Sequence, residues 1–147
     1  MNLLKIVAPV VLALLAITSA PAYAETLKGP ISARVIRVID GDTLEVEVRI
    51  WFGQDVTVNV RVLGVDTPEM KGKCPAEIEA AKKAGMFTLK LAPPGGLVQL
   101  HNVKPDKFAG RVDAIVKLAD GRDLAAALIA AGLARPYAGD KRQSWCP

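Results

Sequence analysis

Residues 43–62 read TLEVEVRIWFGQDVTVNVRV, and apolar and polar side chains alternate along both halves of this stretch. The apolar positions on one face are Leu44, Val46, Val48 and Ile50 in the first half, then Val56, Val58, Val60 and Val62 in the second. A period of two is typical of a strand with one buried face. Between the halves, residues 51–55 contain Gly53 and favour a turn. The stretch therefore predicts an antiparallel hairpin with one face toward a core.

Further strands and one long helix are predicted on either side of this hairpin. Residues 33–39 alternate and precede it, while residues 97–103 and 111–118 read as a fourth and a fifth strand. Pro75 suits the first turn of a helix that runs to Leu91. The apolar stripe of this helix consists of Ala80, Ala84, Phe87 and Leu91. Two prolines and two glycines at 93–96 end it.

A second, shorter helix follows the last strand. Asp120-Gly121 predicts a turn, and Asp123 is a suitable N-cap. The expected buried face consists of Leu124, Ala127, Leu128 and Ala131. Gly132 ends the helix, and Pro136 prevents its continuation. The resulting order, three strands, a helix, two strands and a helix, predicts a mainly β (α+β) fold: a five-stranded OB-fold barrel with two helices.

The first 24 residues read as a secretory signal peptide. Lys5 precedes an apolar run from Ile6 to Ile17, and Ala22-Tyr23-Ala24 forms an A-x-A cleavage site. The alternative is an uncleaved membrane anchor, for which the run is short. We therefore expect an exported protein, periplasmic or secreted, with a domain at 25–147 and no stable membrane association after cleavage. Without Lys5 the net charge is about +3, which permits an anionic partner.

Two cysteines in an exported chain predict one disulfide, between Cys74 and Cys146. On the chain-entropy model a loop of this length contributes about 4 kcal/mol to stability. Two unpaired thiols are the alternative. A zinc site is disfavoured because two distant cysteines and one histidine are too few ligands.

Two acidic clusters carry the chemistry. Asp40-Gly41-Asp42-Thr43 ends one strand, and Val65-Asp66-Thr67-Pro68-Glu69 follows another. Calcium and magnesium prefer such oxygen ligands. Arg61 and Arg111 have the strand parity opposite to the core, and the guanidinium fork suits a phosphate. Each cluster alone is also a good turn former, but carboxylates and arginines together predict phosphodiester chemistry.

Three motifs in this order resemble the staphylococcal nuclease (thermonuclease) family: Val38-Ile39-Asp40-Gly41-Asp42-Thr43, Arg61-Val62-Leu63-Gly64-Val65-Asp66-Thr67-Pro68-Glu69 and Asp106-Lys107-Phe108-Ala109-Gly110-Arg111. The resemblance extends over residues 33–137. It implies an OB-fold barrel and calcium-dependent, sugar-nonspecific endonuclease cleavage of DNA and RNA on the 5′-oxygen side, which leaves 3′-phosphate ends. The third motif is one residue longer than the family type, with Phe108 where tyrosine is usual.

The resemblance also implies roles for individual residues. Asp42, Asp66 and the backbone carbonyl of Thr67 would ligate Ca²⁺, with another divalent metal as an alternative. Glu69 would be the general base or would position water, while Arg61 and Arg111 would bind the phosphate. Asp40 is left with a turn or an outer position.

Further expectations concern the substrate and the assembly. Lys107 favours electrostatic steering of DNA and RNA, and Tyr137 is placed to stack on a base. Trp145 is expected to pack the C-terminal tail against the barrel. We expect a monomer. The competing function is a non-catalytic OB-fold module that binds single-stranded nucleic acid.

Overall fold

The hairpin expected at residues 43–62 forms in the computed structural model, where β2 (Thr43–Trp51) pairs antiparallel with β3 (Gln54–Val62). The structure describes residues 25–147. The signal-peptide prediction therefore lies outside the described residues.

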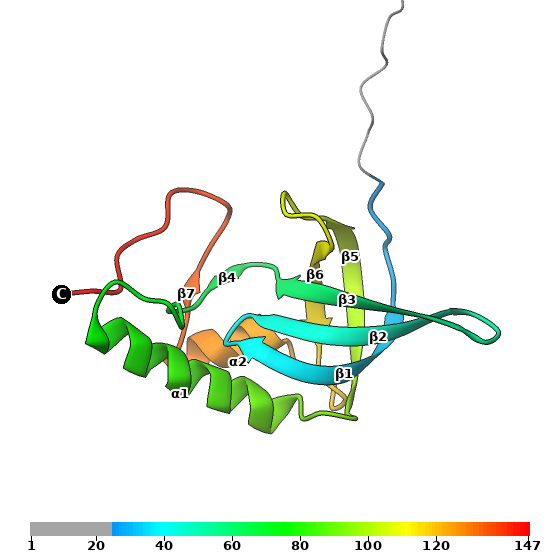
Figure 1. Cartoon of the computed structure of the whole chain (residues 1–147), viewed down its shortest axis with the longest axis horizontal. Helices are drawn as coiled ribbons and strands as arrows, with labels where there is room; N and C mark the ends of the chain where they lie inside the picture. Colours follow the sequence, from blue (N-terminus) through cyan, green and yellow to red (C-terminus); the bar gives the residue numbers. More distant parts are fainter. Residues whose placement is uncertain (1–24) are drawn as a thin grey trace, which may run out of the picture.

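Three more strands complete a barrel: β1 (Ile31–Asp40), β5 (Leu97–Pro105) and β6 (Arg111–Lys117). The strand order is β1-β2-β3-β6-β5, and β5 pairs with β1 to close it (Figure 1). All pairings are antiparallel except that of β3 with β6. The predicted five-stranded OB-fold barrel with two helices is confirmed.

The barrel interior holds the apolar residues of the strands. Leu44, Val46, Val60 and Val62 are fully buried, as the alternation predicted. The outer half of the same hairpin differs, because Ile50 and Val56 are exposed. Figure 1 shows the reason: this end of β2 and β3 extends beyond the other strands, so its side chains have no opposite sheet to pack on.

Both predicted helices are present and cover one end of the barrel (Figure 1). The first, α1 (Pro75–Leu91), has the predicted bounds, and Ala81, Ala84 and Thr88 are its most buried small side chains, with Phe87 and Leu91 packed partly against the core. The second, α2 (Leu124–Ala130), begins as expected, since the Asp123 carboxylate accepts the Ala126 N–H at 3.0 Å. Ala131 was wrongly assigned to its buried face: it is the exposed C-cap, and Ala125 is buried instead.

A short second sheet and a disulfide hold the C-terminal segment. β4 (Val65–Asp66) pairs with β7 (Arg135–Pro136). The disulfide between Cys74 and Cys146 is present, with the two Cα atoms 6.0 Å apart. It joins the start of α1 to the tail. Within residues 25–147 no helix is both long and apolar enough to cross a membrane.

Helix α1 fixes the first acidic cluster. The Thr88 hydroxyl, fully buried, donates to the Gly41 carbonyl at 2.7 Å. A Cβ at Gly41 would lie 2.7 Å from the Ala84 Cβ and 2.9 Å from the Thr67 Cγ2. Only glycine therefore allows the turn between β1 and β2 to sit this close to both α1 and the second cluster.

Thr88→Val tests this attachment. Valine keeps the shape but leaves the buried Gly41 carbonyl without its donor, so we expect a loss of about 1–3 kcal/mol in the free energy of unfolding. Urea denaturation followed by circular dichroism measures the loss. Thr57→Val, on an exposed part of β3, is the matched control and should stay within about 0.5 kcal/mol. Equal stability of both variants would contradict the attachment.

Candidate active site

The two acidic clusters meet at one end of the barrel. The Asp42 carboxylate accepts the Thr67 backbone N–H through Oδ2 at 3.1 Å and the Thr43 hydroxyl through Oδ1 at 3.1 Å. Asp42 and Asp66 are both buried, with Asp66 only 3% exposed. The 25-residue separation of Asp42 and Thr67 in sequence is thus bridged directly. The structure brings together the carboxylates and the Thr67 backbone singled out as metal ligands.

Asp40 holds the backbone of Asp42 in the turn between β1 and β2. Its Oδ1 accepts the Asp42 N–H at 3.1 Å, which is a turn interaction. Burial, followed by the charge of Asp42, raises the pKa of Asp40 to about 6. The raised pKa of Asp40 therefore shows an electrostatic cost of placing it beside Asp42 in a buried turn.

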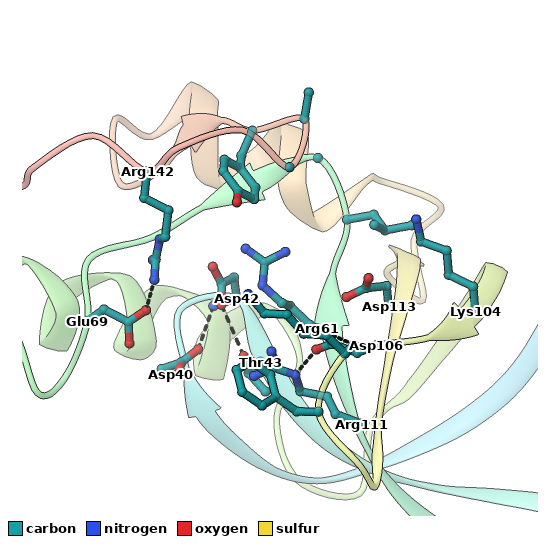
Figure 2. A pocket seen from close by; sticks show the side chains of 17 residues that line it. Asp40, Asp42, Thr43, Arg61, Glu69, Lys104, Asp106, Arg111, Asp113 and Arg142 are labelled. Carbon is teal, nitrogen blue, oxygen red and sulfur yellow. Dashed lines mark hydrogen bonds and ion pairs between the residues drawn. The ribbon is translucent and has the colours of Figure 1, made fainter. Parts of the chain in front are cut away.

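Both predicted arginines line a pocket of about 650 Å³ beside the clusters (Figure 2). Arg61 donates to the Val65 carbonyl at 3.3 Å, and its guanidinium lies 5.3 Å from the centre of the Tyr137 ring. Asp42 and Glu69 line the same pocket. The expectation that strand parity places Arg61 and Arg111 on one non-core side agrees with this geometry.

The longer third motif still delivers its arginine to the pocket. Arg111 forms an ion pair with Asp106, and its guanidinium stacks on Phe108, 4.6 Å from the ring centre. The Lys107 ammonium lies 5.2 Å from the same ring. Phe108, in the place of a tyrosine, thus forms an apolar base for two cations, an arrangement that cation–π attraction favours.

Asp113 is a pocket residue that the sequence reasoning did not select. The strand register places it between Arg61 of β3 and Lys104 of β5. Its buried Oδ1 has no hydrogen-bond partner. Burial, followed by the charge of Asp106, raises the pKa of Asp113, while the cations on both sides act in the opposite direction. No motif marks this residue; only the pairing of β6 with β3 and β5 does.

Arg142 of the C-terminal tail is the second residue that sequence reasoning missed. Its guanidinium forms ion pairs with the Asp66 and Glu69 carboxylates and donates a hydrogen bond to the Thr67 carbonyl at 3.0 Å. Burial acts to lower the pKa of Arg142, but the hydrogen bonds and charges of Glu69 and Asp66 together outweigh it and raise that pKa. Figure 2 shows the side chain reaching down from the tail to Glu69. A signal was available, because Cys146 lies four residues after Arg142 and Cys74 lies five after Glu69.

A further cluster of possible metal ligands lies behind Glu69. Cys74, Glu77 and Cys146 place their ligand atoms within 4.8 Å of one another. The two sulfurs are bonded together, so they are not free thiolates. The buried Glu77 carboxylate accepts the backbone N–H groups of Glu69 at 3.3 Å and Lys73 at 2.9 Å. This cluster therefore fixes the loop that carries Glu69.

Comparison with known families agrees with the geometry. A family model described as staphylococcal nuclease homologue matches residues 59–145. The match includes Arg61, the second acidic cluster, Arg111 and the tail with Arg142. No curated protein matches the chain.

Asp113→Asn tests the half-buried carboxylate in the pocket, whose Oδ1 is buried without a partner. Because the pKa of Asp113 is raised in the folded protein, its ionisation opposes folding, and the cost develops as pH rises above the ordinary value of 3.8. The variant should therefore melt at a higher temperature than the parent at pH 7 and at nearly the same temperature at pH 3. Thermal melts by circular dichroism at both pH values measure this.

Asp120→Asn is the matched control for that substitution. Asp120 is exposed, and hydrogen bonds from Arg122 lower its pKa, so this variant should show no gain at pH 7. A melting difference for Asp113→Asn that is the same at pH 3 and pH 7 would contradict the account.

Proposed function

The chain belongs to the staphylococcal nuclease homologue family, and from that premise we propose that it is a metal-dependent endonuclease acting on the phosphodiester bonds of DNA and RNA. One observation carries the proposal: a single pocket is lined by Asp42 and Glu69 on one side and by Arg61 and Arg111 on the other. Carboxylates suit a divalent cation, and guanidinium groups suit the phosphate.

The acidic side has the donor set for a hard cation. Asp42, Asp66 and the Thr67 carbonyl offer oxygen ligands, and we propose that they hold Ca²⁺ or another divalent ion. Arg142 supports this fit as a stand-in, since its guanidinium bonds to two of these three groups. When bound, such an ion neutralises a phosphate oxygen and stabilises the charge that develops in the transition state.

The other groups divide the remaining work. Arg61 and Arg111 orient the phosphate and stabilise its added charge. Glu69 orients a water molecule and takes its proton as the water oxygen bonds to phosphorus. The bond from phosphorus to the 5′-oxygen breaks, this oxygen leaves with the bonding electrons and takes a proton from solvent, and the other product ends in a 3′-phosphate.

The rim of the pocket favours a nucleic-acid substrate. Phe108 is exposed and carries cations on its face. Tyr137 lines the pocket beside Arg61. We propose that Lys107 attracts the backbone and that Tyr137 stacks on a base.

The setting of this activity is also a proposal. We propose that residues 1–24 direct export to the periplasm or the medium and that the domain at 25–147 acts there as a monomer. The disulfide supports this, because such bonds persist in oxidising compartments.

A cleavage assay tests the enzyme against the binding module. Purified protein incubated with plasmid DNA, and separately with RNA, should cleave both with Ca²⁺ and neither with a chelator. Mn²⁺ and Mg²⁺ define the metal preference. A gel-shift assay runs in parallel, and retained binding without cleavage under every metal would establish the non-catalytic OB-fold module instead.

Arg61→Ala tests the phosphate role. Removing one charge-stabilising donor should reduce kcat by about 100-fold or more, while the melting temperature changes little because Arg61 lies off the core. Arg34→Ala, which removes the same charge from an exposed position on β1, is the matched control and should retain activity. Normal cleavage by Arg61→Ala would overturn the assignment.

A further inference from the structure

The C-terminal tail lies across the acidic cluster. Arg142 bonds to Asp66 and Glu69 and to the Thr67 carbonyl. The Trp145 indole N–H donates to Asp66 Oδ2 at 3.1 Å. The tail therefore engages both carboxylate oxygens of Asp66. A cation that binds Asp66 must displace these contacts between Asp66 and the tail.

The tail is fastened at both ends of this contact. On one side, the Tyr137 N–H donates to the Gly64 carbonyl at 3.0 Å, next to the pairing of β4 with β7. On the other, Cys146 is bonded to Cys74. Residues 138–145 form a strap between these two anchors, and the red segment of Figure 1 shows this loop beside β4 and the start of α1.

Contacts of Arg135 and Tyr137 with the strap hold its backbone and Trp145 in place. The Arg135 guanidinium stacks on the Trp145 ring at 3.7 Å from its centre and donates to the Ser144 carbonyl at 3.0 Å. The Tyr137 hydroxyl donates to the Asp140 carbonyl at 2.8 Å. The strap is thus preorganised, which lowers the entropy cost of placing Arg142 on the carboxylates.

We propose that Arg142 is a built-in competitor for the metal position, and that the Cys74–Cys146 disulfide keeps it there by holding its local concentration high. This inference rests on the metal site in the proposed function. A short tether of this kind makes docking of the guanidinium intramolecular, with an effective concentration on the order of millimolar or more. Metal binding and Arg142 docking exclude each other at Asp66 and Thr67, so the strap must yield before the ion is held.

Competition makes a quantitative prediction. If the guanidinium is docked about nine-tenths of the time, the apparent Kd for the ion is about tenfold weaker than that of the open site. Arg142→Ala should therefore bind Ca²⁺ at least about tenfold more tightly than the parent, as measured by isothermal titration calorimetry. Arg122→Ala, which removes the same charge from the exposed turn with Asp120, is the matched control and should stay within about twofold of the parent.

The tether is tested by Cys74→Ser/Cys146→Ser. We expect this double variant, once circular dichroism shows it folded, to bind Ca²⁺ several-fold more tightly than the parent. Combined with Arg142→Ala, the two serines should add nothing, because the disulfide acts through Arg142. An equal effect of the serines with and without Arg142 would overturn the role of the tether.

Trp145 gives a second readout that does not depend on activity. The chain has two tryptophans, so a Trp51→Phe background leaves Trp145 alone. Ca²⁺ should break its bond to Asp66 and shift its emission to the red as the strap moves toward solvent.

Two further outcomes separate this inference from the proposed function. Unchanged Ca²⁺ affinity of Arg142→Ala, with cleavage reduced, would make Arg142 a substrate contact and overturn the competition while leaving the nuclease intact. Absence of binding in every variant at millimolar Ca²⁺, Mn²⁺ and Mg²⁺ would overturn the metal assignment and this inference with it.

Discussion

Repulsion among the carboxylates at one end of the barrel is the constraint that the surrounding hydrogen bonds offset. The turn between β1 and β2 places Asp40 beside Asp42, and the raised pKa of Asp40, which burial and the charge of Asp42 cause, records the cost. Hydrogen bonds lower that cost: backbone N–H groups reach Asp40 and Asp42, and the Trp145 indole reaches Asp66. Thr88 and the absence of a side chain at Gly41 keep the turn against α1. The acidic end is therefore held by donors from four separate parts of the chain.

The same crowding explains how charge is divided across the pocket. The acidic side attracts a cation and repels a phosphate, whereas the side with Arg61 and Arg111 does the reverse. In the proposed function, a cation offsets the carboxylates so that a phosphodiester fits across both sides, which makes the proposed metal and the two arginines complementary. Asp113 lies between cations on neighbouring strands, where it limits the positive charge of that side before substrate arrives.

Local patterns predicted most of the fold because alternation and capping are local properties. The bounds of α1, the Asp123 cap and the five strands follow from residues close together in sequence. The exposed ends of β2 and β3 and the position of Ala131 were missed, since they depend on where neighbouring strands end and where a helix stops. Within the site, motifs located the carboxylates and arginines. Asp113 was missed because strand register alone places it in the pocket. Arg142 was missed because a disulfide between cysteines 72 residues apart in sequence brings the tail to the site.

The crosslink also links stability to function at a single contact. In the cation-free site, the positive charge of Arg142 balances the negative charges of Asp66 and Glu69. The disulfide lowers the entropy cost of holding Arg142 against these carboxylates. Under the proposed competition, that contact is broken when a divalent ion binds, so each increment that Arg142 adds to the stability of the cation-free site is subtracted from the affinity for the ion. Reciprocity then requires a bound ion to weaken the docking of the tail by the same factor. In this proposal the strap and the metal position form one coupled equilibrium, with Asp66 shared between them.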